Sequence, residues 1–106
     1  MKLVRKVTWN ENRKRYEVEW VLHLGEEEIE NKYRVNLTNW YVEFERDEEE
    51  EENVYRAWIR YGEEDVANIE EDTRRIIEAI KGAVKEVRSH EAKAEALTKE
   101  FEFDVD

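Results

Sequence analysis

Residues 14–24 of the chain, KRYEVEWVLHL, alternate between apolar and polar side chains more regularly than any other stretch. Side chains of a β-strand point in turn to its two faces, so this alternation predicts a strand with one face in a core and the other in water. The apolar positions are Tyr16, Val18, Trp20, Leu22 and Leu24. The stretch therefore indicates a sheet that is covered on one side only.

Three other stretches in the first part of the chain alternate in the same way and predict further antiparallel strands. Residues 2–9 form a hairpin with the first stretch through a turn at Asn10–Arg13, and residues 54–61 form a later strand. Between these two strands, the apolar residues of 33–44 move from odd to even positions at Thr38–Asn39. One extra residue inserted in the strand at that point would put them all on one face, so we expect a β-bulge that curves this strand.

The apolar period changes to that of a helix after Gly62. Apolar side chains then follow the i, i+3, i+4, i+7 spacing of a helix that covers a core. They are Val66, Ile69, Ile76, Ile77, Ile80, Val84 and Val87. A helix that continued to Leu97 would be about 50 Å long at 1.5 Å per residue, which is too long for strands of this size. We therefore expect a break near Ser89–His90.

The last ten residues, 97–106, alternate once more and predict a fifth strand, with Leu97, Phe101, Phe103 and Val105 on one face. Counting strand directions along the chain places it beside the first strand. The predicted fold is thus a single α+β domain over residues 1–106, with the elements in the order ββββαβ. Its curved, antiparallel five-stranded sheet has the predicted order 5-1-2-3-4, with one long helix packed on the apolar face.

Charge dominates the composition. Charged residues make up 44% of the chain, and 29 acids against 18 Lys and Arg give a net charge of −11. Such a charge opposes binding to nucleic acids or anionic membranes, so we expect neither. The chain has no Cys and no long apolar run, which predicts a soluble cytoplasmic protein. Abundant Glu, Lys and Arg are typical of hyperstable proteins, and the composition favours a de novo designed origin slightly over a hyperthermophile one.

Six acids in a row separate two predicted strands: Asp47, Glu48, Glu49, Glu50, Glu51 and Glu52. The predicted topology brings this run to the same end of the sheet as the first hairpin, where residues 1–15 carry six basic side chains and one acidic. On one interpretation the run is a loop that the basic hairpin tip neutralises. On the other it mimics a nucleic acid and binds a basic protein, as small anti-CRISPR inhibitors do, although no motif links the chain to them.

Trp58 is predicted to lie between Arg56 and Arg60 on the face of the sheet away from the helix. Trp and Arg are enriched at the energetic centres of protein interfaces, but stacking of an arginine on the ring within the monomer explains the same residues. Opposite charges are expected to face each other across the strands of this surface, as an ion ladder. If the strand 54–61 is an open edge, it can also pair with a second copy to form a homodimer.

Catalysis and metal binding have little support. Ser89 adjoins His90 without a surrounding motif, and the chain has only two His for a zinc site. Three Gly in total exclude a Gly-rich phosphate loop. We therefore predict no catalytic, cofactor or metal site. A ligand pocket between sheet and helix is the one small-molecule site left open, lined by Trp20, Trp40 and Phe103.

The sequence as a whole favours a non-enzymatic scaffold or protein-interaction module that requires no cofactor and no obligatory partner. Two alternatives remain, an acidic inhibitor that binds a basic protein and a small-molecule binder.

Overall fold

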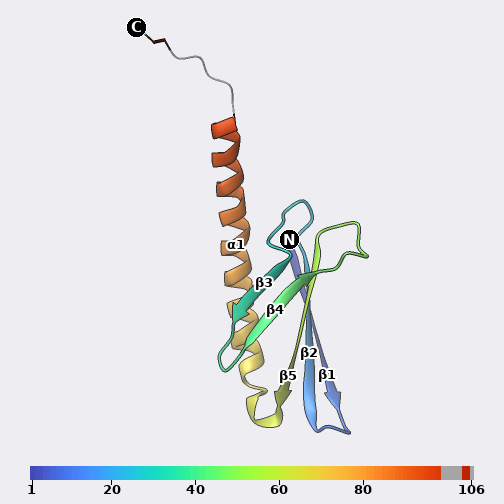
Figure 1. Ribbon diagram of the computed structural model, residues 1–106. Helices are drawn as coiled ribbons and strands as arrows, with labels where there is room; N and C mark the ends of the chain where they lie inside the picture. The colour runs from blue at the N-terminus through green and yellow to red at the C-terminus, as the bar shows by residue number, and fades with distance from the viewer. Residues whose placement is uncertain (99–103, 106) are drawn as a thin grey trace.

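The computed structural model describes residues 1–98, 104 and 105. Five antiparallel strands form one sheet, and a long helix crosses one face of it (Figure 1). The elements are β1 (Lys2–Asn10), β2 (Arg15–His23), β3 (Lys32–Asn36), β4 (Tyr41–Arg46), β5 (Val54–Gly62), the 3₁₀ turn η1 (Glu63–Asp65) and α1 (Asn68–Thr98). The predicted α+β class, with an antiparallel sheet and one long helix, is confirmed.

The strands lie in the order β1-β2-β5-β4-β3, so the predicted order 5-1-2-3-4 is wrong. The error begins at the phase change in residues 33–44. Those residues form two paired strands, β3 and β4, and not one bulged strand. In the turn between them the N–H of Leu37 donates to the carbonyl of Trp40 at 2.7 Å. A tight turn restores the apolar phase as well as a bulge does, so the alternation did not separate the two.

β5 occupies the centre of the sheet, between β2 and β4. It pairs with β2 along nine residues, from His23↔Val54 to Arg15↔Gly62. Long strands with bulky core-facing side chains gain most from a neighbour on each side, whereas the short, charged β3 tolerates an edge position. The strand 54–61 is therefore not an open edge, which removes the condition on which the homodimer through it was predicted.

α1 is continuous over 31 residues, and the predicted break near Ser89–His90 is wrong. The sequence after His90 is rich in Ala, Glu and Lys, which favour a helix, and contains no Gly or Pro. Residues 89–95 are exposed, because α1 projects past the end of the sheet (Figure 1). Leu97 and Thr98, predicted to begin a fifth strand, belong to α1. Residues 99–103 and 106, which make up most of that prediction, lie outside the described residues.

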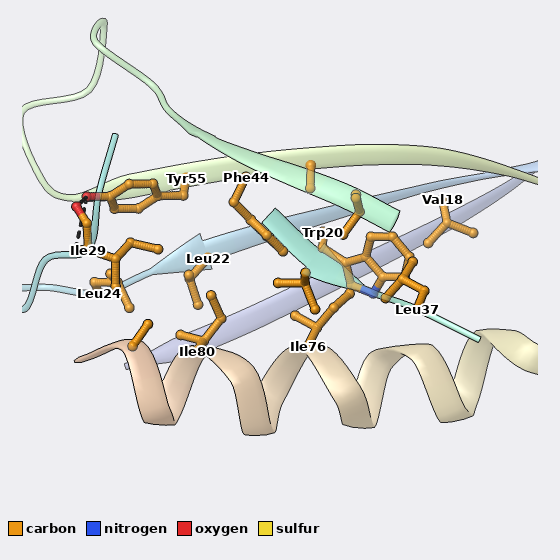
Figure 2. Packing of buried hydrophobic residues seen from close by; sticks show 14 of the residues in the cluster. Val18, Trp20, Leu22, Leu24, Ile29, Leu37, Phe44, Tyr55, Ile76 and Ile80 are labelled. Atoms are coloured by element: carbon orange, nitrogen blue, oxygen red, sulfur yellow. Dashed lines mark hydrogen bonds between the residues drawn. The ribbon is translucent and has the colours of Figure 1, made fainter. Parts of the chain in front are cut away.

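The core lies between the sheet and α1. Figure 2 shows Trp20 and Leu22 of β2 directed at Ile76 and Ile80 of the helix, and all four are buried. The apolar face that the sequence predicted for residues 14–24 is thus the core face. Complete burial of one aliphatic side chain contributes roughly 1.5–3 kcal/mol to folding, so this layer supplies most of the driving force.

One charged residue, Asp72 of α1, lies inside this layer with 2% of its surface exposed. Its Oδ1 accepts hydrogen bonds from the Thr38 N–H at 2.8 Å and from the Thr38 hydroxyl at 2.7 Å. Its Oδ2 accepts the Tyr61 hydroxyl at 2.6 Å. A buried carboxylate is tolerated when such bonds satisfy it. Asp72 thereby joins the helix to the β3–β4 turn and to β5.

The Tyr61 hydroxyl makes folding sensitive to alkaline pH. Burial, together with the bond to Asp72, raises the pKa of Tyr61 far above its usual value of 10.0. A raised pKa in the folded state contributes stability that is complete below the unfolded pKa of about 10 and is lost as the pH rises beyond it. We therefore expect Tyr61→Phe to lower the free energy of unfolding by about 1.5–3 kcal/mol at neutral pH, and by less at pH values above about 10.

Urea denaturation across this pH range measures the difference between the two proteins. Tyr41→Phe is the matched control, because Tyr41 is exposed and its hydroxyl bonds to no other described residue. If the loss of unfolding free energy in Tyr61→Phe stays constant with pH, the pKa of Tyr61 is not raised in the folded protein.

Two glycines provide a test of backbone conformation. A Cβ at Gly82, in the middle of α1, would meet nothing within 4 Å. Since Gly costs a helix interior about 1 kcal/mol relative to Ala, Gly82→Ala is expected to stabilise the fold by about that amount. Gly25 has equally open surroundings but a φ of +65°, so Gly25→Ala should destabilise it. Chemical denaturation measures the free energy of unfolding of both variants. If Gly82→Ala leaves this free energy unchanged or lowers it, α1 is not continuous in solution.

Candidate interaction surface

The face of the sheet away from α1 carries charged side chains that pair across the strands. Lys6 lies opposite Glu19, Glu17 opposite Arg60, and Arg56 opposite Glu45. Opposite charges thus face each other across these strands, with partners that the corrected strand order changes. The ion pairs on this face include Arg56 with Glu19 at 3.8 Å and Lys32 with Glu45 at 3.9 Å. Each such exposed pair contributes only roughly 0.2–1 kcal/mol.

Aromatic side chains interrupt this charged surface on β4 and β5. Trp58 is 49% exposed, and the Arg60 guanidinium carbon lies 5.2 Å from the centroid of its ring. Trp40, in the β3–β4 turn, is 66% exposed and stacks on Tyr41, with ring centroids 5.8 Å apart and planes 7° apart. The Arg34 guanidinium carbon lies 3.5 Å from the Tyr41 centroid. We refer to Arg34, Trp40, Tyr41, Trp58 and Arg60 as the aromatic patch.

A shallow cavity of about 430 Å³ joins the two halves of the aromatic patch, because Trp40 and Arg60 both line it. Asp65, Asn68 and Asp72 make most of the remaining lining polar. The ligand pocket predicted from the sequence stays a prediction, because only two of its three residues are described. Trp20 is buried in the core and Trp40 lies at the surface, while Phe103 is outside the described residues.

Arg34 and Arg60 keep their charges available. Within the part of the chain that the structure describes, neither has a carboxylate oxygen within 4.0 Å. Arg56 differs, because its Nε donates to Asp47 Oδ2 at 2.8 Å and its other nitrogens lie 3.8 Å from Glu19 and 3.9 Å from Glu50. Of the three predicted interaction residues on β5, Trp58 and Arg60 thus belong to the aromatic patch, while Arg56 anchors the acidic run.

The acidic run forms the loop between β4 and β5, at the end of the sheet where His23 pairs with Val54. The basic hairpin tip lies at the opposite end, where Arg15 pairs with Gly62 (Figure 1). The predicted neutralisation of the run by that tip is therefore wrong, and it failed because it depended on the strand order. Arg56 is ion-paired with the Asp47 and Glu50 side chains of the loop, and Arg46 donates a hydrogen bond to the Asp47 carbonyl.

A second acidic segment, residues 24–31, lies beside this loop. The N–H of Leu24 donates to the carbonyl of Asn53 at 2.9 Å, and the Asn53 side chain donates to the carbonyls of Gly25 and Glu27. Glu27 is also ion-paired with Arg88 of α1. The sequence analysis missed this neighbourhood because the residues that make these contacts are more than twenty positions apart in the chain. We call residues 24–31 and 47–53 together the acidic end.

Other classes of site find no geometry in the described residues. No three or more His, Asp or Glu side chains in residues 1–98, 104 and 105 are grouped so that they could hold a metal ion. In that same part of the chain, no helix combines the length and the apolar character needed to cross a membrane. No family model, curated protein or solved structure matches the chain.

The contact between Arg56 and Asp47 is open to direct measurement. The hydrogen bond from Arg56 is the main cause that lowers the pKa of Asp47 below its usual value of 3.8, and the charge of Arg46 contributes least. Arg56→Gln should therefore raise the pKa of Asp47, and Arg46→Gln should raise it much less. NMR titration of the carboxyl carbon in the three proteins checks this order, and equal shifts in the two variants would contradict it.

Proposed function

We propose that the chain is a non-enzymatic protein-interaction module that binds its partner through the aromatic patch. The observation that supports this is the exposure of two tryptophans and a tyrosine on a sheet face that α1 does not cover. A monomer gains nothing by leaving these rings in water, whereas the centres of interfaces are enriched in Trp, Tyr and Arg. The rings are also held in place by stacking, so little conformational entropy is lost on binding.

The chemistry of the patch defines the partner. Its surface has to offer apolar side chains to Trp40 and Trp58, and a carboxylate to Arg34 or Arg60. Over longer distances, the net charge of −11 of the whole chain favours a partner whose overall charge is positive. Small-molecule binding is less well supported, because five of the eight residues that line the cavity beside the patch are Asn, Asp or Arg, whereas ligand pockets are mainly apolar.

The acidic end supports a second candidate function, that of an inhibitor which occupies the nucleic-acid site of a basic protein. Its support is the contact between two acidic segments at one end of the sheet. Arg56 and Arg88 each pair with acids of these segments and so neutralise part of the charge. The aromatic patch is therefore the stronger proposal.

Quantitative pull-downs from a cell lysate with two variants separate the two functions. Trp58→Ala removes the centre of the patch, and we expect it to lose at least about nine tenths of the bound partner, as hot-spot truncations do. The comparison variant changes Glu48, Glu49, Glu51 and Glu52 to Gln and keeps Asp47, so that the anchor to Arg56 survives; it should retain the partner.

The opposite result, with binding lost in the glutamine variant and kept in Trp58→Ala, would establish the inhibitor and reject the patch. If neither the wild-type chain nor either variant retains a specific partner from the lysate, both proposed functions are rejected. Because Trp58 is half exposed, the alanine variant is expected to unfold at nearly the wild-type urea concentration, which shows that any loss is local.

A further inference from the structure

Among the described residues, β1 lies at one edge of the sheet and pairs only with β2. It is nine residues long, whereas the other edge strand, β3, has five. The N–H and C=O groups along the outer side of β1 are therefore free to pair with an added strand. Exposed edges of this length are binding sites for extended segments, because the main chain supplies the hydrogen bonds and alternate side chains supply the specificity.

An apolar groove runs beside this edge, on the core side of the sheet. It has a volume of about 240 Å³ and lies between β1 and α1. Its apolar lining comes from Met1, Leu3, Leu22, Ile76, Ile77 and Ile80. Ile77 is 38% exposed, although Ile76 beside it and Ile80 nearly one turn farther on are buried. An added strand would place an apolar side chain of its core face over this groove and would remove Ile77 from water.

The charges of β1 define the rest of the occupant. Lys2 and Lys6 project from the outer face, and neither has a carboxylate oxygen within 4.0 Å among the described residues. Arg5 points to the core side, where it contacts Glu70 and Thr73. A strand that fits has apolar side chains toward the groove and acids on the other face. The β1 strand of a second copy does not fit, because pairing two β1 strands would place positively charged side chains opposite each other, and like charges repel.

We propose that the β1 edge binds, as an added strand, the C-terminal segment 99–106 of a second copy of this chain. The sequence of that segment, KEFEFDVD, alternates as the edge requires. Phe101, Phe103 and Val105 would lie on the core side, with Val105 beside Leu3 at the groove. Glu102 would lie opposite Lys6 on the other face. Exchange of the segment in both directions gives a dimer with twofold symmetry.

Chain length selects a second copy over the segment's own β1. Lys81 lies beside Lys2 at the groove, and α1 continues for 17 residues to Thr98, about 25 Å farther on. Eight extended residues span at most about 28 Å. A segment that folded back on its own helix would thus end near the start of β1, with almost nothing left to pair. The segment of a second copy has no such limit.

Sedimentation equilibrium of the full-length chain over a range of concentrations tests the proposal. The wild type should show a concentration-dependent dimer. Lys6→Glu and Glu102→Lys should each weaken dimerisation about tenfold, because each replaces an attraction across the strands by a repulsion. The double variant Lys6→Glu/Glu102→Lys restores opposite charges and should recover wild-type dimerisation. Lys93→Glu, an exposed change of the same size on α1, is the control and should have no effect.

Three results would overturn the proposal. A chain that stays monomeric at every concentration has no such interface, and a dimer that is insensitive to both single changes uses a different surface. Single changes that weaken the dimer without recovery in the double variant would mean that residues 6 and 102 do not face each other. Circular dichroism confirms that each variant is folded, and the result does not depend on the partner of the aromatic patch.

Discussion

The pairing of β2 with β5 along their whole length determines the arrangement of the rest of the molecule. Because Arg15 lies opposite Gly62 and His23 opposite Val54, every position on β5 has a fixed face and a fixed end. Tyr61 faces the core, where it meets Asp72, and Trp58 faces water. The same register carries the loop before Val54 to the end of the sheet away from the basic hairpin. A shift by one residue would exchange these faces and bury Trp58.

The sequence predicted which face of a strand is buried, but it did not predict which strands lie next to each other in the sheet. Alternation identified the core side of residues 14–24 and the exposure of Trp58, because the period of a strand is local. Strand order depends on whether Thr38–Asn39 is a bulge or a turn, and both restore the same phase. That single ambiguity misplaced the acidic run beside the basic tip and made a central strand an edge. It also placed Trp40 in the core, whereas a turn exposes it.

The acidic excess of the chain is spread unevenly, and this limits what net charge can predict. On the open face of the sheet, opposite charges lie across from each other and nearly cancel. The surplus acids gather at the acidic end, where Arg56 and Arg88 hold the two loops together. Acids that would otherwise repel are kept close because these cations and the side chain of Asn53 connect the loops. Arg34 and Arg60 are left unpaired on a chain that has too few cations, which makes them available to a partner.

The length of α1 determines how far from the sheet the C-terminal segment begins. A helix that ended with the sheet, as the strand lengths suggested, would leave the C-terminal segment close enough to pair with its own β1 and close the edge. The run of Ala, Glu and Lys after His90 continues the helix instead and carries the chain away from the sheet. Among the described residues the edge then stays open, and the groove beside it exposes Ile77. In the proposed dimer, helix propensity in residues that touch nothing in the core therefore directs the segment to a second copy.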